Sequence, residues 1–145
     1  MSTFQNPSEF NPVIRVSTAF VALYFVFLYL QSFSKFYLFF KARAKDPKAN
    51  FAKIKYANTD LLAVTVDRTV GNMMEQAIPF LLSLWLCAVF ESPVYAAKLG
   101  WYWLLFRAAY PFGYYSRSFW LFLSTLPCYA FIFMMLYPVA SKAMN

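Results

Sequence analysis

The sequence predicts an all-α integral membrane protein: a four-transmembrane-helix bundle with a left-handed, up-down topology, formed as a single domain over residues 1–145. Of the 145 residues, 61% are hydrophobic and 23% are aromatic, whereas soluble domains contain about 45–50% apolar residues. The apolar segments run without polar alternation, which is typical of helices rather than of barrel strands. No linker or repeat divides the chain, so we expect one domain.

The four helices follow from the apolar segments and the turns between them. Between Arg15 and Lys35 the chain carries no charge, and at 1.5 Å per residue this segment crosses a hydrocarbon core of roughly 30 Å. Between Arg117 and Lys142 the chain is again uncharged. Turns at Glu91-Ser92-Pro93 and near Gly113 separate the later segments. The predicted helices cover about 13–40, 60–90, 94–112 and 118–140.

The second predicted helix has two halves of different polarity. Asn58, Thr59 and Asp60 offer helix-capping side chains at its start. Its length of about 30 residues corresponds to roughly 45 Å, which exceeds the hydrocarbon core. The polar first half must therefore project through the interface or face a cavity lined by protein. Pro79 predicts a kink within this helix, because its missing N–H leaves a carbonyl without a donor.

The predicted loop at 41–58 concentrates the positive charge of a chain whose net charge is +7. Nucleic-acid binding is one meaning of a basic patch. Between two membrane spans, such a patch is a topology signal that also contacts anionic headgroups. We therefore expect membrane lipids and no nucleic acid as partners, with this loop on the cytosolic side or its organellar equivalent and both termini on the opposite side. The loop holds one acidic residue, Asp46, and six basic ones: Lys41, Arg43, Lys45, Lys48, Lys53 and Lys55.

A stripe of polar side chains in the second predicted helix is the candidate functional feature. Spacings of four, three and four place Arg68, Asn72, Glu75 and Pro79 on one helical face. Charged groups at membrane depth are costly unless they meet polar partners. Near the end of the third predicted helix, at the same membrane face, Arg107 adds a second cation. Tyr110 and Tyr114 add hydroxyl groups there.

Three roles for this stripe follow from the residues alone. The first is an internal salt-bridge network, which needs partners on other helices because an arginine and a glutamate seven residues apart lie about 10 Å apart along a helix. The second is a zwitterionic ligand, whose carboxylates suit the arginines and whose amine suits Glu75. The third is a small channel or carrier. The chain has no histidine, and Cys87 and Cys128 lie deep in apolar segments, so we expect no metal site.

Two motifs resemble those of the MAPEG superfamily, the membrane-associated proteins of eicosanoid and glutathione metabolism. Arg68-x3-Asn72-x2-Glu75-x3-Pro79-Phe80 resembles its helix-two signature. The segment Arg107-x2-Tyr110-x2-Gly113-Tyr114 resembles the end of helix three in the leukotriene C synthase branch. The superfamily also includes microsomal glutathione transferases and microsomal prostaglandin E synthase.

The resemblance implies a glutathione-binding homotrimer with glutathione S-transferase or peroxidase activity, in the endoplasmic reticulum or another organelle membrane. Glutathione, the co-substrate, would bind between protomers at the cytosolic face. Lipophilic electrophiles or lipid hydroperoxides would approach from the lipid. The implied catalytic residues are Arg117 and Tyr114. The implied glutathione-binding residues are Arg68, Asn72, Glu75, Arg107 and Tyr110.

The chain departs from the family pattern at the start of the fourth predicted helix. Catalytic members carry an arginine there that stabilises the glutathione thiolate, and here Phe119 to Leu121 occupy that place. Arg117, beside Ser116 and Ser118, lies two to four residues earlier. Thr69-Val70-Gly71 also replaces the more usual Ala-polar-x. These departures favour an alternative in which the chain is a catalytically degenerate, accessory subunit of a larger membrane complex.

Overall fold

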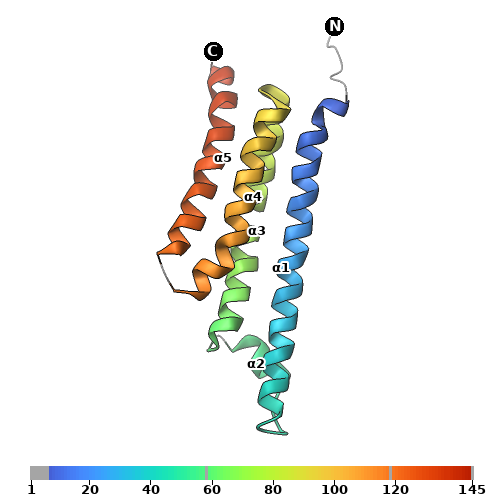
Figure 1. The fold of residues 1–145 in the computed structure, drawn as a ribbon, viewed down its shortest axis with the longest axis vertical. Helices are drawn as coiled ribbons and strands as arrows, with labels where there is room; N and C mark the ends of the chain where they lie inside the picture. Colours follow the sequence, from blue (N-terminus) through green and yellow to red (C-terminus); the bar gives the residue numbers. More distant parts are fainter. Residues whose placement is uncertain (1–6, 58, 118, 145) are drawn as a thin grey trace.

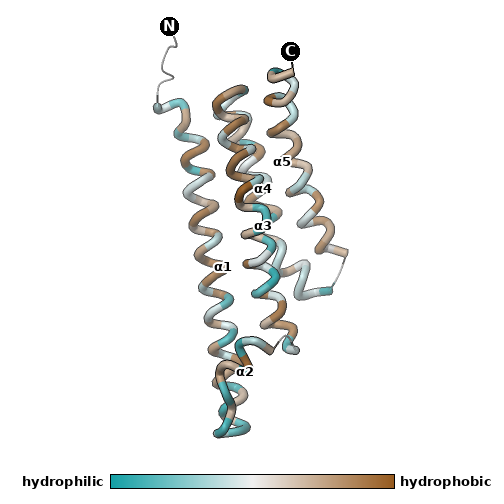
Figure 2. Tube along the Cα trace, turned by 180° about the vertical axis from the view of Figure 1, so that it is seen from behind, coloured by the Kyte–Doolittle hydropathy of each residue, from teal (hydrophilic) through white to brown (hydrophobic). Residues whose placement is uncertain are grey.

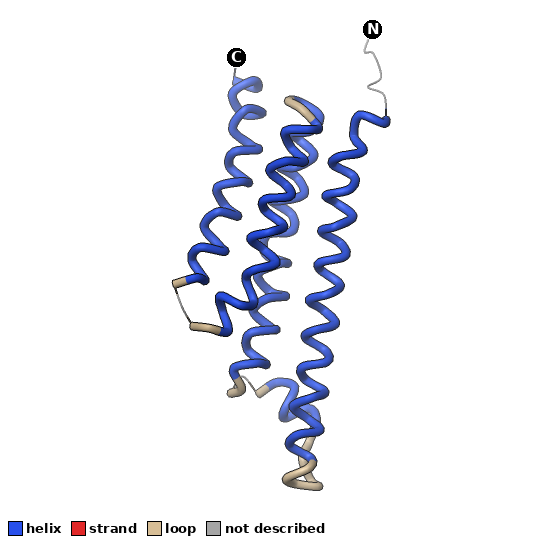
Figure 3. Tube along the Cα trace, in the orientation of Figure 1, coloured by secondary structure: helices blue, strands red, loops and turns tan. Residues whose placement is uncertain are grey.

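The computed structural model describes residues 7–57, 59–117 and 119–144, and it is helical over nearly all of them (Figure 3). A 3-10 turn, η1 (Pro7–Phe10), leads into the first long helix. Four long helices and one short helix follow, and the described residues contain no strand. The helices are α1 (Asn11–Arg43), α2 (Phe51–Tyr56), α3 (Leu61–Phe90), α4 (Pro93–Tyr115) and α5 (Trp120–Met144).

The long helices run alternately up and down, so that the start of α1 and the end of α5 lie at one end of the bundle (Figure 1). The short helix α2 lies at the opposite end, where α1 and α3 extend beyond the turn between α4 and α5. The interpretation of 41–58 as loop was therefore incomplete. Asn50 caps α2 by accepting hydrogen bonds from the backbone N–H groups of Ala52 and Lys53.

Capping side chains mark the starts of helices, whereas internal prolines do not end them. Asp60 accepts hydrogen bonds from the backbone N–H groups of Leu62 and Ala63 at the start of α3, as expected; Asn58 lies outside the described residues. The helix then continues to Phe90 through Pro79. Helix α4 continues beyond the predicted end at 112 to Tyr115, passing through Pro111.

The core of the bundle is a stack of aromatic rings where α1, α3 and α4 meet. The rings of Phe80 and Trp103 stack with centroids 3.9 Å apart, and Phe20 packs 5.6 Å from Phe80. Above them, α4 approaches α1 and α3 closely at Gly100. A Cβ atom there would lie 2.7 Å from Val16 Cγ1 and 3.0 Å from Leu84 Cδ1. A residue without a side chain therefore permits this contact.

Hydrophobic residues predominate along the long helices, and hydrophilic residues gather at the α2 end and in one stretch of α3 (Figure 2). Large exposed side chains include Phe33, Phe112, Phe119 and Phe133, each about 70% accessible. Soluble monomers rarely expose so much contiguous apolar surface. Among the described residues, three helices are long and apolar enough to cross a membrane: Pro7–Arg43, Leu61–Phe90 and Leu121–Met144.

Candidate functional site

The polar stretch of α3 faces a cavity of about 450 Å³ between α3 and α4. This volume lies within the roughly 300–1,000 Å³ range of small-molecule sites. Among the described residues, its wall comes from two helices, α3 and α4. The cavity is lined by Val64, Asp67, Arg68, Gly71, Asn72 and Glu75 from α3 and by Tyr110 and Tyr114 from α4.

Arg68 and Glu75 lie on this cavity as an unpaired cation and an unpaired anion. Both side chains are exposed, and within the described ranges neither forms an ion pair or a hydrogen bond through its side chain. Seven residues of helix separate them by about 10 Å along the axis. In this described part of the chain, Arg68 and Glu75 therefore do not form the internal salt-bridge network that the sequence left open.

Arg107 does not line the cavity; it lies behind the cavity wall, between α3 and α4. Its side chain is fully buried. It donates hydrogen bonds from Nη1 to Asn72 Oδ1 and from Nη2 to Gln76 Oε1. Its guanidinium carbon also lies 4.9 Å from the ring centre of Trp103 and 5.7 Å from that of Tyr110. Arg107 therefore joins the two helices and orients Asn72 and Tyr110, which do reach the cavity.

Gln76 is a residue of this network that the sequence reasoning missed. It is buried and lies four positions after Asn72, so the two amides project from the same side of α3. This four-residue spacing is the feature of the sequence from which Gln76 could have been predicted. The side-chain nitrogen of Gln76 and the Nε of Arg107 are both buried without a hydrogen-bond partner in the described residues. Within the part of the chain that the structure describes, two N–H donors of this network therefore have no acceptor, and the buried guanidinium of Arg107 is bound by the neutral amide oxygens of Asn72 and Gln76.

Asp67 connects the cavity wall to α1. Its Oδ1 accepts a hydrogen bond of 2.7 Å from Gln31 Nε2 and pairs with Lys35 Nζ at 2.8 Å. The side chains of Lys35 and Asp67 are 13% and 29% exposed, so this ion pair is partly shielded from water. The sequence alone does not identify the partners of Asp67, which lie more than thirty residues away in α1. This contact fixes the rotation of α3 relative to α1.

Tyr114 lines the candidate cavity, and Arg117 lies beside that cavity. Arg117 lines a neighbouring cavity of about 690 Å³, which shares Val64 and Tyr114 with the first. Arg117 is exposed, and its backbone φ of 50° lies in the left-handed region that non-glycine residues rarely adopt. Ser118 lies outside the described residues. Phe119 and Leu121 line the same cavity, where the family pattern would have an arginine.

The fold and this cavity define a helical membrane protein with a zwitterionic site between two of its helices. The sequence model of the MAPEG family matches residues 17–137, and the chain belongs to that family. Membership, together with the long apolar helices, indicates a membrane protein.

One similar relative is an uncharacterized protein from Synechocystis sp. (strain ATCC 27184 / PCC 6803 / Kazusa), which is 50% identical over 51 residues. The aligned segment covers 35% of this chain and 37% of that protein, so the chain matches little more than a third of its length. No solved structure matches the chain.

Proposed function

We propose that this protein binds glutathione in the cavity between α3 and α4 and activates its thiol for transfer to lipophilic electrophiles or for reduction of lipid hydroperoxides. The observation that carries this proposal is the pair of unpaired charges on one cavity, Arg68 and Glu75. A carboxylate of the tripeptide fits the guanidinium fork of Arg68. The ammonium group fits Glu75, and the amide of Asn72 is free to donate to a peptide oxygen because its oxygen accepts from Arg107.

The chemistry requires a thiolate near Arg117 and Tyr114. A free thiol with a pKa near 8.5 is mostly protonated at neutral pH, and a nearby cation lowers that pKa. In conjugation, the sulfur attacks an electrophilic carbon and the leaving group departs with its electron pair. In hydroperoxide reduction, the sulfur attacks the terminal oxygen, the O–O bond breaks and the alkoxide takes a proton. A second glutathione then reduces the resulting sulfenic acid and forms a disulfide.

The same proposal includes the assembly and its orientation. Helix α4 packs within the bundle beside three apolar spans, and we assign it as the fourth span. A neighbouring protomer of a homotrimer would close the outer side of the cavity. We propose that this end lies at the cytosolic face of an organelle membrane such as the endoplasmic reticulum, with both termini opposite; the six basic residues around α2 support this orientation.

Glutathione binding by the detergent-purified protein, measured by isothermal titration, tests this proposal. Arg68→Ala should weaken binding by roughly tenfold or more, because it removes a charge-assisted pair. Arg15→Ala is the matched control, since the side chain of Arg15 is also exposed but lies near the start of α1, at the other end of the bundle. Unchanged affinity in Arg68→Ala would show that the site assignment is wrong.

A second candidate function rests on Phe119 and Leu121, which line the cavity beside Tyr114 where an arginine would assist the thiolate. On that account the chain binds glutathione without turnover, as an accessory subunit of a larger membrane complex. Turnover of a chlorinated aromatic substrate by an isolated homotrimer contradicts the accessory role. Stoichiometric co-purification with other subunits, without turnover, contradicts the free-standing enzyme.

A further inference from the structure

The α2 end of the bundle carries a small basic cavity that the glutathione proposal does not use. The cavity has a volume of about 290 Å³ and lies where the end of α1, helix α2 and the start of α3 meet. Lys41 and Lys45 of the α1 end line it, together with Ile54 from α2, and Thr59 and Asp60 from the start of α3. Two lysines, one threonine and one aspartate therefore line one hollow.

The positive charge at this end is only partly balanced by the carboxylates of Asp46 and Asp60. All six basic side chains of the α2 end are exposed, and among the described residues none of them forms an ion pair. The two carboxylates nearby are occupied by backbone donors. Asp46 accepts from the N–H of Lys48, and Asp60 caps α3.

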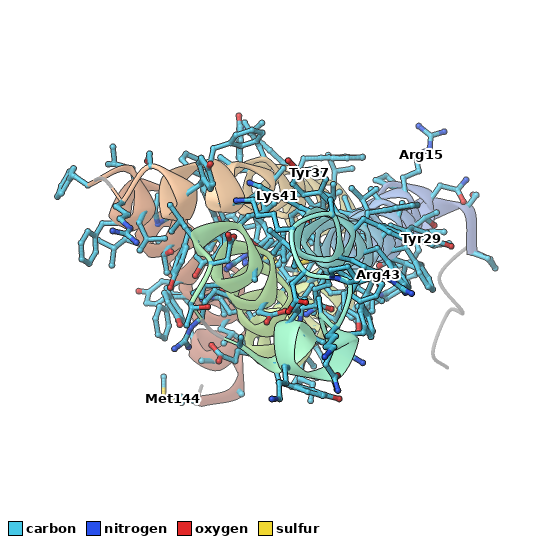
Figure 4. The ribbon with its side chains drawn as sticks, turned by 90° about the horizontal axis from the view of Figure 1, so that it is seen from below. Arg15, Tyr29, Tyr37, Lys41, Arg43 and Met144 are labelled. Atoms are coloured by element: carbon cyan, nitrogen blue, oxygen red, sulfur yellow. The ribbon has the colours of Figure 1, made fainter. Side chains whose placement is uncertain are left out.

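Aromatic side chains place this cavity at the membrane surface. Tyr37, Phe40 and Tyr56 are 58%, 64% and 72% exposed, and such rings favour the level of the lipid headgroups. Phe51 of α2 packs between Phe36 and Phe39 of α1, at 5.3 Å from each ring, and so holds α2 against α1. Figure 4 looks up at this end and shows Tyr37, Lys41 and Arg43 around the lower end of α1.

We propose that this cavity, between the ends of α1 and α3 and helix α2, binds the phosphate headgroup of an anionic phospholipid from the surrounding leaflet. Lys41 and Lys45 pair with the phosphate, and the hydroxyl group of Thr59 donates to it. The acyl chains lie along the exposed apolar face of α1. Asp60 also lines the cavity, and its carboxylate repels an anion. The phosphate must therefore lie close to both Lys41 and Lys45, so that their two positive charges outweigh this repulsion. This inference does not depend on glutathione binding.

The test compares three probes on the full-length, detergent-purified protein by native mass spectrometry: dioctanoyl phosphatidylglycerol, dioctanoyl phosphatidylcholine and inorganic phosphate at equal ionic strength. We expect the anionic lipid to bind at least about tenfold more tightly than the zwitterionic lipid or free phosphate. Equal affinity for the two lipids would overturn the proposal. Saturation by free phosphate at the same concentration would instead identify a soluble-anion site and also overturn it.

Two double variants, each of which removes two positive charges, distinguish binding in the cavity from nonspecific attraction to the basic surface. Lys41→Gln/Lys45→Gln removes the lysines that line the cavity, and we expect a loss of affinity for phosphatidylglycerol of roughly tenfold to thirtyfold. Lys53→Gln/Lys55→Gln removes two exposed charges of α2 outside the lining and should change affinity by less than about threefold. Equal losses in both would overturn the proposal. Lys41→Arg/Lys45→Arg should retain binding, which distinguishes a lost charge from a misfolded variant.

Discussion

The guanidinium of Arg107 donates a hydrogen bond to the side-chain oxygen of Asn72, and Asn72 forms part of the cavity wall. The cation is thus separated from the cavity by one amide. A charge buried in this way is stable only when its donors have acceptors, and Asn72 and Gln76 supply two. The position of an amide in the cavity wall is therefore set by Arg107, which does not itself line the cavity.

Replacing Arg107 by methionine should destabilise the protein more than it alters the cavity surface. The change leaves the buried oxygen of Gln76 and the partly buried oxygen of Asn72 without their donor, so the free energy of unfolding should fall by about 2–4 kcal/mol. Thermal unfolding in detergent, followed by tryptophan fluorescence, measures this. Arg68→Ala serves as the control and should leave the melting temperature unchanged, because Arg68 is exposed and unpaired. A variant that melts like the wild type but loses glutathione would place Arg107 in contact with the ligand.

Arg117→Gly should separate stability from activity. Glycine relieves the left-handed backbone strain of about 1–2 kcal/mol, and it gives back about 0.5–1 kcal/mol through the greater freedom of the unfolded chain. The stability should therefore stay unchanged or rise by up to about 1 kcal/mol. If Arg117 assists the thiolate, kcat should fall at least about tenfold while glutathione affinity changes little. Wild-type turnover in both Arg117→Gly and Arg117→Asn would remove Arg117 from the mechanism.

Gly100→Ala should disrupt the contact between α4 and its neighbours. The added methyl group would meet Val16 Cγ1 at 2.7 Å, and overpacking of this kind costs about 1–3 kcal/mol. Gly71→Ala is the matched control within α3, because a Cβ there has no neighbour within 4 Å. It should leave stability unchanged or raise it by up to about 1 kcal/mol through helix propensity. Equal melting temperatures for the two variants would contradict the close approach at Gly100.

The two ion pairs of the described chain should differ in strength. Double-mutant cycles on Lys35–Asp67 should give a coupling energy of about 1–2 kcal/mol, because the pair is partly buried and reinforced by Gln31. The Lys142–Glu91 pair, 2.6 Å apart, is more exposed, so its coupling should stay below about 1 kcal/mol. The opposite order would show that Asp67 does not tie α1 to α3. Urea unfolding of each single and double variant provides the measurement.

The membrane helices could be predicted because long apolar runs without polar alternation are typical of helices and not of barrel strands. Helix α2 escaped prediction because six residues are too few to show a period, and its lysines resemble those of a loop. The spacing of Arg68, Asn72 and Glu75 placed them on one face of α3, and the structure brings all three to one cavity.

Spacing within a helix does not determine which way that helix is rotated in the bundle. For this reason the contacts of Arg107 with Asn72 and Gln76 could not be predicted, and its role in binding glutathione stays a prediction. The partners of Asp67 were equally hidden, because Gln31 and Lys35 become neighbours only when α1 and α3 pack. Contacts between distant segments depend on packing that no local pattern encodes.

The central claim is that the cavity between α3 and α4 holds glutathione at a protomer interface. The most direct measurement is an experimental structure of the purified protein with saturating glutathione. We predict a homotrimer with density for the tripeptide in this cavity, a carboxylate within about 3 Å of Arg68 and the ammonium group beside Glu75. A cavity left empty at saturating glutathione, or density for the tripeptide at another site, would contradict the account.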